Sequence, residues 1–184
     1  MLGIRVDKDI DLRLHHANRA DGVFRLVDEN RERLRRWLPW VDETTSPDDT
    51  KRYIREMLHS LAEGTEYGFE ILQGSEIVGG IGLRVIPDVA EAEIGYWLSA
   101  QAEGRGIVTR ASRALLRFAF DELGMHRVII KCAAENARSR AVPERLGFTL
   151  EGTFREREVT PGHGRQDELV YGLLRSEWTD RGVP

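Results

Sequence analysis

The stretch EAEIGYWLSAQAEGRGI, residues 91–107, decides the fold of this chain. Residues 91–99 are typical of a strand, and from residue 108 onward apolar side chains recur at helical spacing. Residues 101–106 therefore lie between a strand and the first turn of a helix. Such a junction presents unpaired backbone N–H groups and the positive end of a helix dipole, which suit a phosphate. Gly104 and Gly106 would let the backbone approach an anion, but glycines also serve ordinary turns, and both interpretations stay open.

The pattern on either side of this stretch predicts a single α/β domain over residues 1–184. The strand–helix–strand unit around residues 91–133 should make its two strands parallel, while the hairpins on either side should be antiparallel. We therefore expect a mixed, mostly antiparallel central sheet with helices on both faces. The predicted helices span residues 18–36, 48–63, 108–123 and 137–146. The predicted strands span residues 67–73, 76–84, 91–99, 126–133, 148–159 and 166–174.

Local signals mark several ends of these elements. Asn18 or Asp21 could cap the first helix, and Pro39 should end it. The Ser46-Pro47 pair is a plausible start for the second helix. A turn is expected at residues 161–164, between the last two strands.

Composition and charge narrow the class of protein. The chain has 184 residues and a net charge of −4 with both signs interspersed, which argues against a dedicated nucleic-acid binder. The N-terminal region has no apolar run of the kind a signal peptide needs, and no stretch approaches the ~20 apolar residues of a membrane span. The single cysteine, Cys132, fits a cytoplasmic protein and is expected to be a buried structural thiol. The histidines lack metal-ligand spacing, so no metal is expected.

Residues 101–106 and residues 136–148 carry motifs that resemble those of the GNAT superfamily of N-acetyltransferases. Residues 101–106 resemble its Q/R-x-x-G-x-G/A pyrophosphate loop, and they match neither a dinucleotide fingerprint nor a P-loop. Residues 136–148, with the pattern N-x-x-S-x-x-V-x-E-x-L-G-F, resemble the second signature. Trp37-Leu38-Pro39-Trp40 and residues 164–171 are similar to the ribosomal-protein, Rim-type branch. Because the motifs agree in order over nearly the whole chain, together they are far more specific than any one alone.

The resemblance implies the GNAT acyl-CoA N-acyltransferase fold and acetyl-CoA as cosubstrate. In such proteins, the strand before the loop diverges from its neighbour, and the pantetheine arm pairs with the exposed backbone. The pyrophosphate would rest on the backbone amides of residues 101–107. The residues that the resemblance assigns to acetyl-CoA are Trp97, Leu98, Ser99, Gln101, Gly104, Arg105, Gly106, Ile107, Asn136 and Ser139.

A neutral amine would attack the thioester directly, so a base and a donor to the departing sulfur are useful. Glu93 is the predicted base, because its strand position holds a glutamate in some family members. Glu66, Glu70 and Glu91 are rivals, and water could also serve. A structural or surface role for Glu93 stays open.

The residue that usually donates a hydrogen bond to the departing sulfur is absent from this sequence. Many family members place a tyrosine one residue before the glutamate of the second signature, and here that position is Pro143. The ribosomal-protein branch instead has a serine, Ser139 here, whose hydroxyl could donate to the sulfur. Ser139 could equally be a cap or a packing residue. Proline inside this short helix removes a hydrogen bond, and nothing in the sequence explains it.

The acceptor is a primary amine, and the resemblance favours a protein N-terminal α-amine of the ribosomal-protein type. A small-molecule amine and a non-catalytic acetyl-CoA sensor are the alternatives. Trp37 and Trp40 could pack in the core or line the acceptor pocket. The resemblance also implies a possible homodimer through the final strands, with no direct contact to nucleic acid or membrane.

Overall fold

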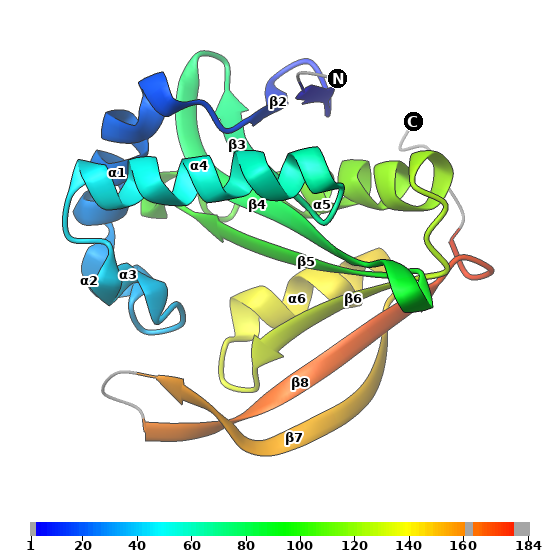
Figure 1. Ribbon diagram of the computed structural model, residues 1–184. Coiled ribbons are helices and arrows are strands. Elements are labelled where there is room, and N and C mark those ends of the chain that lie inside the picture. The colour runs from blue at the N-terminus through cyan, green and yellow to red at the C-terminus, as the bar shows by residue number, and fades with distance from the viewer. Residues whose placement is uncertain (1–2, 161–163, 179–184) are drawn as a thin grey trace.

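The computed structural model describes residues 3–160 and 164–178, whose strands form one eight-stranded sheet in the order β1-β2-β3-β4-β5-β6-β8-β7 (Figure 1). All neighbouring strands are antiparallel except β5 and β6, which are parallel. The predicted mixed, mostly antiparallel sheet is therefore confirmed. The strands are β1 (Gly3–Arg5), β2 (Ile10–Leu14), β3 (Glu66–Gln73), β4 (Glu76–Ile86), β5 (Glu91–Leu98), β6 (Arg127–Ala133), β7 (Thr149–Thr160) and β8 (Gly164–Leu174).

Helices cover both faces of the sheet (Figure 1). On one face, Trp97 of β5 packs against the buried apolar side chains of α1 to α3. On the other face, Ile94 and Leu98 belong to the main core, together with the apolar side of α5. Side chains alternate along a strand, so this one strand separates the two layers. The helices are α1 (Ala20–Glu29), α2 (Arg31–Leu34), α3 (Trp40–Glu43), α4 (Pro47–Glu63), α5 (Ile107–Arg117) and α6 (Ala137–Leu146), and α5 continues into a π-helical turn at Phe118–Glu122.

Several predicted ends are confirmed in atomic detail. Ser46 accepts a hydrogen bond from the backbone N–H of Asp49, and the Asp49 carboxylate accepts one from the backbone of Ser46. This capping box starts α4, with Pro47 at its first position. The helix predicted at 137–146 ends at Gly147, whose φ of 82° is the left-handed conformation that glycine adopts without strain.

The N-terminal part differs from the prediction. Strands β1 and β2 were not expected, and the helix predicted over 18–36 is interrupted at Asn30. Neither Asn18 nor Asp21 caps α1. The His16 side chain caps the short 3-10 turn before it, Ala17–Arg19, by accepting a hydrogen bond from the Asn18 backbone. Pro39 does not end a helix either, because α2 has already ended and Pro39 precedes the first turn of α3.

At the other end of the chain, the hairpin β7–β8 forms the far edge of the sheet. Of the turn predicted at 161–164, residues 161–163 lie outside the described residues, and Gly164 begins β8.

Candidate active site

Strands β5 and β6 pair at one end only. Their parallel ladder covers Glu91 to Glu93 of β5, whereas β5 stays paired with β4 as far as Leu98. From Ile94 onward, the edge of β5 that faces β6 has no strand partner among the described residues. The two strands therefore diverge in the middle of the sheet, with unpaired backbone groups along β5 (Figure 1). Gly95 lies in this diverging part, as predicted.

The loop after β5 forms an open cradle at the start of α5. Gly104 and Gly106 have φ values of 74° and 67°, and a Cβ added to either would meet no atom within 4 Å. Gly106 is the N-cap residue of α5, and no described side chain caps this helix. The backbone N–H groups of its first turn are therefore free to bind an anion, assisted by the helix dipole. Gln101 and Arg105 are exposed in the same loop.

Arginine side chains fix the surroundings of this loop. Glu103 pairs with Arg33 of α2 and with Arg138 of α6. Arg33 also donates a hydrogen bond to the backbone carbonyl of Leu98, so that this carbonyl, predicted to be open to pantetheine, already has a partner. Ser99 is buried, and its N–H donates to Val78 at 2.8 Å. No local pattern predicts this role of Arg33, because α2 and the loop are far apart along the chain.

Helix α6 brings its two predicted residues next to the diverging strands. The Asn136 side chain caps α6 by accepting a hydrogen bond from the Ser139 N–H at 3.2 Å, which leaves its amide nitrogen available to a ligand. The Tyr96 hydroxyl lies 3.2 Å from the Ser139 hydroxyl oxygen and 3.0 Å from the Ser139 carbonyl oxygen, to which it donates. Tyr96 was not among the predicted site residues.

Cys132 of β6 borders the same group of side chains. It is buried, as predicted, and burial raises the pKa of its thiol to about 11, against an opposing hydrogen bond with Ser139. The thiol thus stays protonated near neutral pH and is a poor nucleophile.

A cavity of about 620 Å³ opens on the face covered by α1, α3 and α4. Trp40, Tyr53 and Trp97 form aromatic parts of its wall, and the rings of Trp40 and Trp97 meet edge-on with centroids 6.2 Å apart. Trp40 therefore lines the pocket rather than the core. Tyr96 also reaches this cavity. The cavity and the α5 loop thus meet at β5, where the strands diverge.

The four candidate bases have different surroundings. The carboxylate of Glu93 lies 2.9 Å from Lys131 and 2.7 Å from Arg84. Burial alone would raise its pKa, but the hydrogen bonds from Lys131 and Arg84 outweigh burial and lower it. This environment does not favour Glu93 as a base, and its catalytic role stays a prediction. Glu66 lines the same cavity, and burial raises its pKa against the attraction of Arg84.

The other two candidates are held in ion pairs. Glu70 is fully buried and lies 2.8 Å from Arg19, and Glu91 pairs with Arg127. Glu66, by contrast, makes no side-chain hydrogen bond or ion pair within the described residues, so of the four candidates it is the carboxylate best placed to accept a proton in this cavity.

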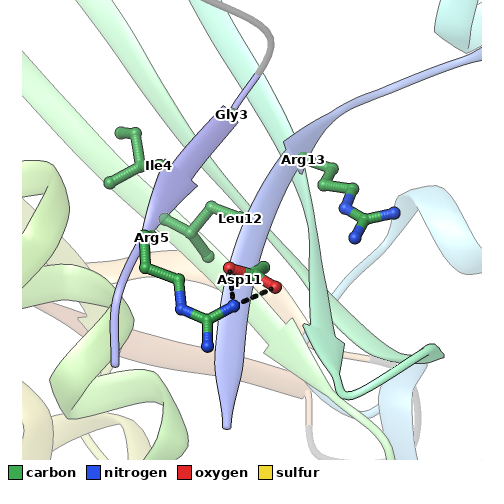
Figure 2. Close-up of a pocket in the computed structure, with 6 residues that line it drawn as sticks. All are labelled: Gly3, Ile4, Arg5, Asp11, Leu12 and Arg13. Carbon is green, nitrogen blue, oxygen red and sulfur yellow. Dashed lines mark hydrogen bonds and ion pairs between the residues drawn. The ribbon is translucent and has the colours of Figure 1, made fainter. Parts of the chain in front are cut away.

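A second hollow, of about 420 Å³, lies between β1 and β2 at the edge of the sheet. Figure 2 shows that Arg5 reaches across to Asp11, with hydrogen bonds of 3.0 and 3.1 Å, whereas Arg13 points away from them. None of the predicted site residues lines it.

Residues 3–160 and 164–178 lack two other kinds of feature. They contain no group of three or more His, Cys, Asp or Glu side chains that could hold a metal ion. No helix within them is long and apolar enough to cross a membrane.

Comparison with known proteins assigns most of the chain to one family. Residues 10–149 match the family model described as an acetyltransferase (GNAT) domain. The putative ribosomal N-acetyltransferase YdaF of Bacillus subtilis is 37% identical over 97% of this chain and 98% of its own length. The ribosomal-protein-serine acetyltransferase of Escherichia coli is 32% identical over 84% of this chain and 87% of its own.

Among solved structures, the ribosomal L7/L12 α-N-protein acetyltransferase RimL in complex with coenzyme A superposes with a TM-score of 0.91. The two are 26% identical, and the match covers 96% of this chain and 99% of the other.

Proposed function

The chain belongs to the GNAT family of acetyltransferases, and we propose that it transfers the acetyl group of acetyl-CoA to the N-terminal α-amine of a protein, of the ribosomal-protein type. The observation that carries this proposal is the match, along nearly the full length, to a relative named for ribosomal N-acetylation. The geometry fits, because the loop at the start of α5 and a broad cavity both adjoin the edge of β5 that has no strand partner.

Acetyl-CoA would lie along the diverging edge of β5. Its phosphates would bind the free amides at the start of α5, with Arg105 contributing charge. The pantetheine arm would run past β5 toward α6, where Asn136 has a free amide nitrogen. The proposed contacts are Trp97, Leu98, Ser99, Gln101, Gly104, Arg105, Gly106, Ile107, Asn136 and Ser139.

The acceptor amine would approach from the cavity under α1, α3 and α4. An N-terminal α-amine has a pKa of about 7.7–8.0, so a sizeable fraction is neutral near pH 7.5 and needs little help to lose a proton. Ser139 would donate a hydrogen bond to the departing sulfur. Glu93 as the base is to be tested against Glu66, whose pKa is raised.

We further propose that residues 1–184 form one such domain, located in the cytoplasm and able to form a homodimer. One continuous sheet across the described residues supports a single domain. Support for the dimer comes from β7, an edge strand on which Leu150, Phe154 and Val159 are about half exposed.

The test is turnover with matched peptides. The protein is incubated with acetyl-CoA and peptides that begin with the N-termini of ribosomal proteins, and CoA release and peptide mass are followed. We expect one acetyl group on the α-amine, and none on the same peptides with a blocked N-terminus and a free lysine. Acetylation of small amines only would replace the protein acceptor with a small molecule. CoA binding without turnover of any amine would favour a sensor.

A further inference from the structure

Pro143 leaves a carbonyl in α6 without its helical partner. In an α-helix, the N–H of each residue donates to the carbonyl four residues earlier, which for position 143 is the carbonyl of Ser139. Proline has no N–H, and its ring crowds that carbonyl. The Ser139 carbonyl therefore needs a donor from elsewhere, because an unpaired carbonyl in a partly buried place is unfavourable.

Tyr96 of β5 supplies this donor. Its hydroxyl donates to the Ser139 carbonyl oxygen at 3.0 Å, from across the region where β5 and β6 diverge. Burial raises the pKa of Tyr96, although the hydrogen bond with Ser139 opposes the rise. The phenol therefore keeps its hydrogen throughout the neutral range and can replace a backbone N–H.

This arrangement decides which hydroxyl holds the second hydrogen. The Tyr96 and Ser139 hydroxyl oxygens are 3.2 Å apart, and a phenol has only one hydrogen to give. Since that hydrogen goes to the carbonyl, the phenol oxygen is left as an acceptor, and the hydrogen between the two hydroxyls belongs to Ser139. The Ser139 O–H can then turn from the phenol oxygen to another acceptor while Tyr96 stays in place.

We infer that Tyr96 is a positioning residue for Ser139, and that Pro143 makes this possible by freeing the Ser139 carbonyl. The inference rests on the proposed role of Ser139 as donor to the departing sulfur. Many family members place a tyrosine at position 143. In this chain the phenol comes instead from Tyr96 of β5, and it acts through Ser139.

A double-mutant cycle on thermal unfolding tests the hydrogen bond without activity. Tyr96→Phe should lower the unfolding midpoint by a few degrees in the parent, because the Ser139 carbonyl loses its donor. In the Pro143→Ala background the alanine N–H can pair with that carbonyl, so Tyr96→Phe should change the midpoint much less. Tyr67→Phe is the matched control: its ring packs edge-on against Phe118, and its hydroxyl makes no hydrogen bond within the described residues. If Tyr96→Phe lowers the unfolding midpoint equally in both backgrounds, Tyr96 does not take the place of the N–H that Pro143 lacks, and the inference is overturned.

Kinetics then test the positioning role. Tyr96→Phe should lower kcat by roughly tenfold or more, as expected when a donor is misplaced, with the KM for acetyl-CoA little changed. An unchanged kcat beside a positive cycle would overturn the positioning role. If no amine is turned over by the parent, the proposed function fails and the link to sulfur with it, while the cycle still decides the hydrogen bond.

Discussion

Gly104 offers the sharpest test of the donor site. It has a φ of 74°, it is exposed, and a Cβ at this position would meet no atom within 4 Å. A side chain at 104 can therefore be added to the loop proposed to hold the phosphates without displacing a neighbour. We compare three substitutions, Gly104→Ala, Gly104→Glu and Gly104→Lys, because all three share the same backbone strain and differ in charge.

The size of the effect follows from Coulomb's law. A non-glycine residue in the left-handed conformation costs about 1–2 kcal/mol, but this cost is present in the free and bound protein alike. It should lower the unfolding midpoint by a few degrees and leave the dissociation constant nearly unchanged. Two unit charges about 4 Å apart in water repel by about 1 kcal/mol, so a glutamate facing a diphosphate with two charges should lose ~2 kcal/mol. That corresponds to roughly 30-fold weaker binding.

The assay is calorimetric titration with CoA. Gly104→Glu should bind roughly 30-fold more weakly than Gly104→Ala, and Gly104→Lys at least as tightly as Gly104→Ala. The difference between the first two should shrink in about 1 M salt, where the screening length is ~3 Å. If Gly104→Glu and Gly104→Ala bind CoA equally well at low salt, the phosphates do not lie at this loop and the reasoning is refuted.

Three further predictions concern other parts of the chain. Ser46→Ala removes one half of the capping box with Asp49 and should cost about 1 kcal/mol, seen as a lower unfolding midpoint. Gly80→Ala places a Cβ 2.5 Å from the indole nitrogen of Trp97, so it should displace this wall of the cavity and raise the acceptor KM more than the Kd for CoA; equal effects on both would contradict the assignment of the cavity. The pKa of Glu93 is lowered from 4.5, so its contribution to stability is present above that value and lost as pH falls through the lowered pKa. Glu93→Gln should flatten the pH dependence of the unfolding midpoint below about pH 4.5. It should leave the shape of the pH–rate profile near neutral pH unchanged. If the substitution instead removes the rise of the rate with pH near neutrality, the result would support Glu93 as the base.

The second N-terminal strand, β2, has a strand pattern in the sequence that neighbouring charged residues obscured. Ile10, Leu12 and Leu14 alternate with charged residues, which is the period of a half-buried strand. Ile10 and Leu12 are fully buried in the core. The charged residues between them, Asp11 and Arg13, made the region look polar, although they lie on the other face of β2.

The surroundings of the candidate carboxylates could not be predicted from the sequence, because they depend on the register of neighbouring strands. Glu66, Arg84 and Glu93 lie directly opposite one another on β3, β4 and β5, so their side chains share one face of the sheet. The strands could be predicted singly, but a shift of one residue in register would move Arg84 to the opposite face. The ranking of Glu66 and Glu93 as bases depends on which of them Arg84 and Lys131 contact. Residue type alone does not give that ranking.

The break in the predicted N-terminal helix has its cause in a contact with the loop after β5. Asn30 is buried; its side-chain N–H donates to the Leu26 carbonyl at 2.8 Å, and its side-chain oxygen accepts from the N–H of Ala100 at 2.8 Å. A tertiary contact thus ends α1 where helical periodicity alone would continue it. One turn later, Arg33 binds the carbonyl at the end of β5. The segment that joins α1 to α2 is therefore hydrogen-bonded to the end of β5 and to the first residue of the loop that follows it.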